Sequence, residues 1–209
     1  MTQDPAISAD KRSRILEIAR TRFLHYGVSK TSMRDIAQDL GISVSNLYLY
    51  FENKRELVLA IAQSCRAEQD KGMEGVLKDA SLKPGQKLEK LLVEKFRKMR
   101  NFRNGHPKGK ELSAYLLKEF PERRKEWEET LENNIRIILD EGSASGYFCI
   151  EDTKHSAHML RIATAQFFVQ AHVELPSLPT ETELVALIHW FLAQIETKAS
   201  QKERELARL

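Results

Sequence analysis

The sequence predicts an all-α protein, and three observations lead to that prediction. Apolar residues recur three and four positions apart along most of the chain, which is the period of a helix. No segment shows a convincing alternating strand pattern or an Asn-Gly hairpin. Prolines fall where a first helical turn tolerates them or between helices. We expect about nine helices, arranged as an amino-terminal helix-turn-helix domain (1–53) and a carboxy-terminal antiparallel helical bundle (54–209).

The first two predicted helices have clear boundary signals. The first carries its apolar residues on one face and ends at Gly27. The second begins after Ser32, because Ser32 and Asp35 have the spacing of a capping box, and it covers 33–40.

A turn and a third helix follow directly. Gly41 supplies a tight turn, and Ser43 can cap a short helix that extends through Tyr50. Asn53 and Glu56 mark the start of a longer helix. Three helices with a tight turn between the second and third describe a helix-turn-helix domain, in which the outer face of the third helix is free to enter a DNA major groove.

The remaining helices are predicted from proline positions and apolar spacing. They cover 84–101, 111–120, 121–141, 152–174 and 180–198. The last residues, 201–209, are expected to form a solvated helical extension or a frayed tail.

Composition limits the class of protein only broadly. The net charge of +3 permits a nucleic-acid partner without demanding one. Cys65 and Cys149 lack a CxxC spacing, so we expect reduced cysteines of a cytoplasmic protein. The sequence begins without an apolar leader and has no apolar run long enough to span a bilayer, so no membrane partner is expected.

The third helix supplies most of the candidate DNA contacts. Leu47 is predicted to point inward, which leaves its neighbours on the outer face. Val44 suits a thymine methyl, and Ser45 or Asn46 can reach base edges. Tyrosine, other hydroxyl and basic side chains nearby suit phosphates. The predicted DNA-binding residues are Thr31, Ser32, Arg34, Val44, Ser45, Asn46, Tyr48, Tyr50 and Lys54.

Residues 14–57 resemble the amino-terminal domain of the tetracycline-repressor (TetR) family. The matching elements are IL..A...F...G at 15–27, TS...IA at 31–37, LGIS at 40–43 and LY.YF..K..L at 47–57. The resemblance implies a homodimeric, ligand-responsive transcriptional regulator that binds a palindromic double-stranded DNA operator. A repressor released by a small-molecule effector is the form we expect, although activation stays open.

The resemblance also implies that the carboxy-terminal domain binds the effector and forms the dimer through its last two long helices. Large apolar side chains of the central helices could line a mainly apolar pocket. The candidate pocket residues are Cys65, Phe96, Met99, Leu116, Phe120, Trp127 and Phe167. The apolar stripe of the last helices is either the core of one bundle or a two-fold interface, and the resemblance favours the interface. The candidate interface residues are Ala157, Ala165, Leu184, Ile188, Phe191, Leu192 and Ile195.

Two charged features have an ordinary and a functional interpretation. His155 and His158 have metal-ligand spacing, but no nearby residues complete a site, so we expect surface or interface histidines and no metal. The segment 95–110 is rich in Lys and Arg and has no acidic residue. It is either a solvated helix end and loop or a supplementary contact to the DNA backbone.

Two other classes of protein are alternatives to a DNA-binding regulator. No GxSxG, P-loop, GxGxxG or HExxH motif is present, so neither an enzyme nor a cofactor is expected. The alternative is a helical small-molecule or lipid-binding protein without a DNA-binding role. It predicts that the outer face of 44–50 has no function.

Overall fold

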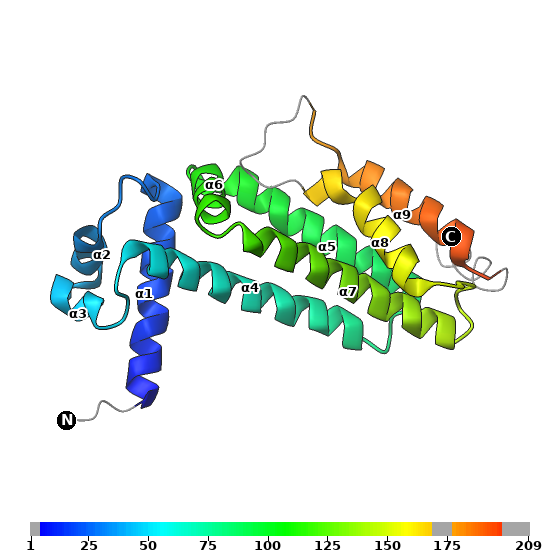
Figure 1. Cartoon of the computed structure of the whole chain (residues 1–209), viewed down its shortest axis with the longest axis horizontal. Coiled ribbons are helices and arrows are strands. Elements are labelled where there is room, and N and C mark those ends of the chain that lie inside the picture. The colour runs from blue at the N-terminus through cyan, green and yellow to red at the C-terminus, as the bar shows by residue number, and fades with distance from the viewer. Residues whose placement is uncertain (1–4, 169–176, 198–209) are drawn as a thin grey trace. The chain divides into compact units, whose positions relative to one another are not determined.

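The structure, a computed structural model, describes residues 5–168 and 177–197. Over these ranges it contains nine α-helices and one 3₁₀ helix, and no β-strand, which confirms the predicted all-α class (Figure 1). The elements are α1 (Pro5–Tyr26), α2 (Met33–Leu40), α3 (Val44–Tyr48), α4 (Lys54–Lys78), α5 (Pro84–Gly105), α6 (Gly109–Glu119), α7 (Glu122–Ala144), α8 (Thr153–Ala163), η1 (Ala165–Phe168, the 3₁₀ helix) and α9 (Glu181–Ile195).

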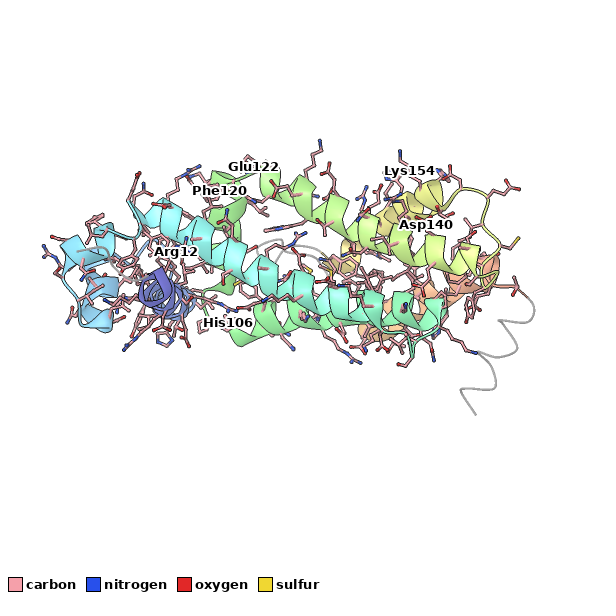
Figure 2. All side chains as sticks on the ribbon, turned by 90° about the horizontal axis from the view of Figure 1, so that it is seen from below. Arg12, His106, Phe120, Glu122, Asp140 and Lys154 are labelled. Atoms are coloured by element: carbon pink, nitrogen blue, oxygen red, sulfur yellow. The ribbon has the colours of Figure 1, made fainter. Side chains whose placement is uncertain are left out.

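The chain forms two compact units. The head unit comprises the chain up to Gln69 together with Phe102–Pro121, and the bundle unit comprises Asp70–Asn101 together with the chain from Glu122. Helices α4 and α5 each continue from one unit into the other, and Phe120 and Glu122, labelled in Figure 2, lie on the two sides of the last division. The segment 102–121, which contains α6, is therefore part of the head unit. The predicted domain boundary after residue 53 stays a prediction.

The head unit is built around large apolar side chains that the sequence pattern placed inside. Phe23, Ile36, Leu47 and Phe51 are at most 1% exposed. Burying a side chain of this size stabilises the fold by about 1.5–3 kcal/mol. Leu112 of α6 belongs to the same cluster, so α6 contributes to the core of the head unit.

The short helices α2 and α3 depend on their caps, as predicted. The Asp35 backbone N–H donates to Ser32 Oγ (3.2 Å), and the Ser32 backbone N–H donates to the Asp35 carboxylate (2.8 Å). Ser43 Oγ accepts from the Asn46 backbone N–H at 3.1 Å. Gly41, between the two helices, has φ +67°, a conformation that suits glycine. Helix α3 ends at Tyr48, two residues before the predicted end.

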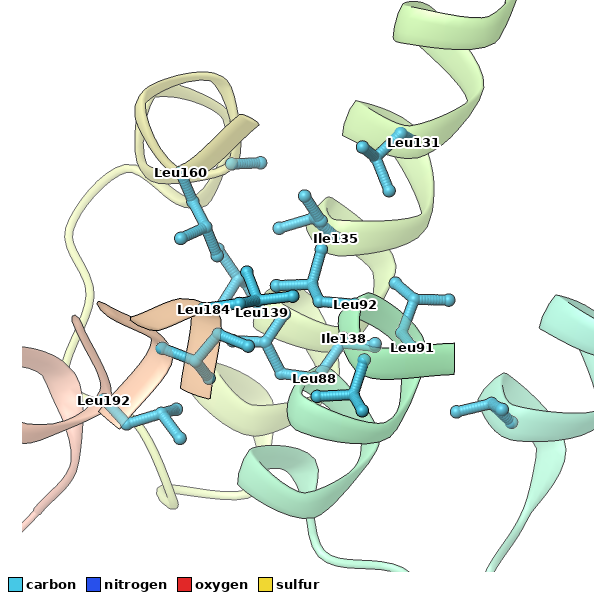
Figure 3. Close-up of a cluster of buried hydrophobic side chains, with 14 of the residues drawn as sticks. Leu88, Leu91, Leu92, Leu131, Ile135, Ile138, Leu139, Leu160, Leu184 and Leu192 are labelled. Atoms are coloured by element: carbon cyan, nitrogen blue, oxygen red, sulfur yellow. The ribbon is translucent and has the colours of Figure 1, made fainter. Parts of the chain in front are cut away.

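The bundle unit has its own apolar core. Figure 3 shows leucine and isoleucine side chains of α5, α7, α8 and α9 pointing toward one another. One charged pair lies at the edge of this core. The ammonium of the buried Lys87 donates to both Glu141 carboxylate oxygens (2.8 and 2.9 Å) and to the Leu77 carbonyl (2.9 Å). The buried cation is therefore fully hydrogen-bonded, which offsets the cost of removing it from water.

The two last predicted helices end earlier than expected within the described residues. The prediction 152–174 was wrong at its carboxy-terminal side, because α8 ends at Ala163 and η1 follows. The C-cap residue is Thr164, which is fully buried and donates its hydroxyl to the Leu160 carbonyl at 2.8 Å. The Phe167 N–H then donates to the Thr164 carbonyl (3.0 Å), a tighter turn that buries the Phe167 ring. Residues 169–174 and the predicted tail 201–209 lie outside the described residues.

Helix α9 ends at Ile195, before the predicted position 198. The chain there becomes extended at Glu196, which forms an isolated antiparallel bridge with Phe148. The Cys149 N–H donates to the Ile195 carbonyl (2.7 Å), and the Thr197 N–H donates to the Tyr147 carbonyl (3.2 Å). These bonds give the backbone of the last described residues partners that a helix would otherwise supply.

Candidate nucleic-acid interface

Helix α3 presents one buried and one exposed face. Leu47 is fully buried, whereas Ser45 and Asn46 are exposed. Tyr48 is 48% exposed and Leu49, directly after the helix, is 80% exposed. Leu49 was not among the predicted contacts. Its position, four residues after Ser45 and therefore on the same helical face, is the signal that identifies it.

The other predicted contacts on this surface differ in how far they are exposed to solvent. Val44 and Tyr50 are half-buried and pack against the core of the head unit. Arg34 is exposed in the first turn of α2. The exposed guanidinium suits a phosphate, while Val44 and Tyr50 also serve the packing of the unit that carries α3.

Three residues predicted to contact phosphates make internal hydrogen bonds. Thr31 is 2% exposed and donates its hydroxyl to the Gly27 carbonyl at 2.8 Å. Ser32 forms the α2 capping box. The Lys54 ammonium donates to the carbonyls of Val28 (2.7 Å) and Thr31 (3.0 Å). These side chains fix the turn before α2, and their contact with phosphate stays a prediction.

Glu111 of α6 was not predicted as a site residue, yet it contacts this same turn. Its Oε1 accepts from the Ser29 backbone N–H (3.0 Å) and from the Ser29 hydroxyl (2.6 Å). The hydroxyl bond, followed by the backbone bond, holds the pKa of the Glu111 carboxyl below its usual range. The two residues are 82 positions apart, so no local pattern in the sequence could have connected them.

The predicted effector residues are divided between the two units. Cys65, Leu116 and Phe120 belong to the head unit, where burial raises the pKa of the Cys65 thiol. The others, Phe96, Met99, Trp127 and Phe167, belong to the bundle unit. The rings of Phe96 and Phe167 meet edge to face with centroids 6.4 Å apart. A pocket lined by these residues stays a prediction.

Most of the predicted interface residues pack inside the bundle unit itself. Four of them are fully buried, namely Ala157, Leu184, Ile188 and Leu192. Ile195 is 9% exposed. Ala165 is exposed and Phe191 is half-buried. The large apolar side chains of α8 and α9 that are exposed are instead Met159 and Ile162 (both 48%) and Trp190 (63%). A dimer interface on these helices stays a prediction, and these three side chains are the ones free to meet a partner.

His158 and the basic segment both have partners in their own chain. His158 Nδ1 lies 2.9 Å from Glu132 Oε2. Within 5–168 and 177–197, no group of three or more His, Cys, Asp or Glu residues is arranged to hold a metal ion. In the basic segment, Arg97 donates to Glu181 (2.6 Å), and Arg100 lies over the Phe96 ring at 5.4 Å. A DNA contact by this segment stays a prediction.

None of the helices that the structure describes combines the length and the apolar character needed to cross a bilayer.

Fold and site together define a protein with a helix-turn-helix head. Residues 15–61 match the family model described as bacterial regulatory proteins, tetR family. The probable transcriptional regulator ArpR of Pseudomonas putida is 31% identical over 90 residues, which are 43% of this chain and 43% of the relative. The chain therefore matches less than half the length of this relative.

Solved structures extend the similarity to the whole fold. A transcriptional regulator from Cytophaga hutchinsonii has a TM-score of 0.73 at 21% identity, over 90% of this chain and 99% of the other. SmeT of Stenotrophomonas maltophilia, in complex with triclosan, has a TM-score of 0.68 at 18% identity, over 90% of this chain and 93% of the other. The amino-terminal residues 15–61 are therefore similar to the tetR family of bacterial regulatory proteins, and the fold of the described residues is similar to that of solved transcriptional regulators. The proteins that this family model describes are regulatory, and the expectation that the chain is not an enzyme stays a prediction.

Proposed function

We propose that this protein is a transcriptional repressor that binds a palindromic double-stranded DNA operator as a homodimer and leaves it when a small-molecule effector binds. The observation that carries the proposal is the two-sided α3. Leu47 fixes one side in the core, while Ser45, Asn46 and Tyr48 face outward from a capped helix-turn-helix.

The exposed face of α3 has the chemistry of a major-groove surface. The major groove is about 12 Å wide and admits a helix. Asn46 can form paired hydrogen bonds with an adenine edge, and Ser45 can bond to several bases. Leu49 suits a thymine methyl, and the Tyr48 hydroxyl and Arg34 suit phosphates. Few of these side chains are charged, so pairing of two heads is needed for tight binding.

The exposed apolar side chains of α8 and α9 support the homodimer. Met159, Ile162 and Trp190 are each at least 48% exposed, although apolar side chains of this size are normally buried. A two-fold interface would cover them. Two heads related by such an axis would bind half-sites separated by about one helical turn of DNA, which is why we propose a palindromic operator.

A small-molecule effector is supported by the apolar content of the chain and by a relative. The solved complex of SmeT contains triclosan, and SmeT is described as the repressor of a multidrug efflux pump. We propose an effector that is mainly apolar, since aromatic side chains such as Phe96 and Phe167 suit such a ligand. Release requires that the effector binds the DNA-free state more tightly than the DNA-bound state.

The test measures DNA affinity with variants that remove one group at a time. The DNA is the region flanking the protein's own coding sequence, at low salt, followed by fluorescence anisotropy. Asn46→Ala and Tyr48→Phe should each weaken binding by about 5- to 100-fold, the usual range for losing a base or phosphate contact. Tyr26→Phe is the matched control, since Tyr26 is similarly exposed (51%) but lies on α1.

Absence of binding by the unaltered protein to these DNA regions would overturn the proposal. A chain that then bound apolar small molecules would instead be the helical small-molecule or lipid-binding protein considered above.

A further inference from the structure

The turn between α1 and α2 precedes the helix-turn-helix, and several of the hydrogen bonds that hold it come from other helices. Gly27 ends α1 with φ +94°, and the Thr31 hydroxyl closes the turn on the Gly27 carbonyl. The carbonyls of Val28 and Thr31 accept hydrogen bonds from the Lys54 ammonium of α4. The turn thus depends on side chains from other helices, and Glu111 is the one that α6 supplies.

Glu111 accepts hydrogen bonds from both the backbone N–H and the hydroxyl of Ser29. Both Ser29 groups donate to the same carboxylate oxygen, Oε1, at 3.0 and 2.6 Å. The two Ser29 bonds are the main reason that the pKa of this carboxyl is lowered, and the Lys108 ammonium, 3.8 Å from Oε2, lowers it further. A charged acceptor makes each bond stronger than a neutral one would.

The close approach of Glu111 is possible because residue 27 is a glycine. A Cβ atom at this position would lie 2.7 Å from Glu111 Oε1, well inside contact distance. The carboxylate therefore fills the space that a side chain at residue 27 would need. Gly27 serves both the positive φ and the approach of α6.

Helix α6 is itself fixed to the head unit near both of its ends. The Lys108 backbone N–H donates to the Leu24 carbonyl (3.0 Å) before the helix begins. At the other end, the Arg55 guanidinium donates to the Glu119 carboxylate (3.1 Å) and the Glu119 carbonyl (2.9 Å), and lies 4.2 Å from the Phe120 ring centroid. Helix α6 is thus bonded to the head unit at both ends, and Glu111 extends from it to the turn.

We propose that Glu111 is a positioning residue for DNA binding: it holds the α1–α2 turn so that α2 and α3 present the DNA-binding face. Loss of its contact with Ser29 lowers DNA affinity without removing any DNA contact. The chain continues from both ends of the segment 102–121 into the bundle unit, so a change that moves α6 also moves this carboxylate. The proposal rests on the proposed function, since it concerns affinity for DNA.

The experiment uses the full chain and the flanking DNA described above. It compares Glu111→Ala, Glu111→Gln, Ser29→Ala and the double variant Ser29→Ala/Glu111→Ala. Glu68→Gln is the charge-matched control, since Glu68 is exposed on α4 in the same unit. Each variant is measured for DNA affinity, for melting temperature, and for hydrogen exchange of the Ser29 amide in the absence of DNA.

We expect Glu111→Ala to weaken DNA binding about tenfold and to speed Ser29 amide exchange by a similar factor. Glu111→Gln should have a smaller effect, because its amide oxygen still accepts. The double variant should bind as Glu111→Ala does, because the two residues act through one contact. If Glu111→Ala does not fold, Glu111→Gln and Ser29→Ala provide the same comparison.

Two results would overturn the inference. One is unchanged DNA affinity in folded Glu111 variants, and the other is simple addition of the Ser29 and Glu111 effects. Both results require that the unaltered chain binds the DNA. If the proposed function fails, the unaltered chain binds no DNA, and this inference fails with it. The two kinds of failure are therefore distinguishable.

Discussion

Two leucines two positions apart separate stability from recognition. Leu47 is fully buried in the head unit, whereas Leu49 is 80% exposed beside the candidate DNA contacts. The same side chain therefore performs different tasks according to the helical face on which it lies.

Truncation of these leucines should have opposite effects on stability and binding. Leu47→Ala should lower the free energy of unfolding by about 2–5 kcal/mol, because it leaves a cavity. Leu49→Ala should change it by less than about 0.5 kcal/mol and weaken DNA binding. Urea unfolding and fluorescence anisotropy measure the two quantities. A Leu49→Ala variant with unaltered affinity for the DNA would remove Leu49 from the interface.

The Glu111 carboxylate should make the stability of the head unit depend on acid pH. Its pKa is lower in the folded chain than the ordinary 4.5. The stabilisation is therefore complete above this ordinary value and is lost as the pH falls through the lower, folded-state pKa. Glu111→Gln should be less stable than the parent at pH 7, and the difference should shrink toward pH 3 in thermal melts. A constant difference across this range would mean that the carboxylate charge does not stabilise the turn.

At the scale of elements, caps determine the two shortest helices. Helices this short gain little from propagation, so satisfying their first N–H groups is a large share of their stability. Ser32 and Ser43 do this for α2 and α3.

Removing either cap should destabilise the head unit while leaving the helix sequences otherwise intact. Ser32→Ala and Ser43→Ala should each lower the free energy of unfolding by about 1 kcal/mol, measured by urea unfolding. Ser45→Ala, inside α3 and exposed, is the matched control and should be close to neutral. Equal stability of Ser43→Ala and Ser45→Ala would show that the α3 cap contributes nothing.

Local signals explain why these elements were predictable and others were not. Ser32, Gly41 and Ser43 act on backbone within three or four residues of themselves, so the sequence alone places them. Helix α8 ends at the fully buried Thr164, and burial is a result of packing that no local pattern expresses. The Ser29–Glu111 contact is likewise a product of packing between distant parts of the chain.

At the scale of the whole molecule, apolar periodicity predicted which helices pack but not what they pack against. Leu184, Ile188 and Leu192 have the spacing expected of an interface and are buried in their own bundle unit. An apolar stripe looks the same in sequence whether it faces another helix of the chain or a second subunit. The structure shows that this stripe packs within its own unit, and contact of α8 or α9 with a second subunit stays a prediction.

The proposed homodimer should therefore be sensitive to Trp190 on α9. Trp190→Glu should weaken dimerisation at least about tenfold, because it places a charge in an apolar interface. Sedimentation velocity over a concentration series measures the dissociation constant. Ile137→Glu on α7 is the matched control, since Ile137 is also an exposed apolar residue (39%) on a different helix. Equal behaviour of the two variants would place the interface elsewhere.

The division of the head unit between two stretches of sequence has a consequence for its synthesis. Leu112 lies in the core of the head unit, and Glu111 completes its first turn, yet both are translated long after α3. The nascent head therefore cannot complete its core until the chain around residue 121 has left the ribosome. By then α4 and α5 have already been made, so α1, α2 and α3 must wait for α6 before the unit that contains them is complete.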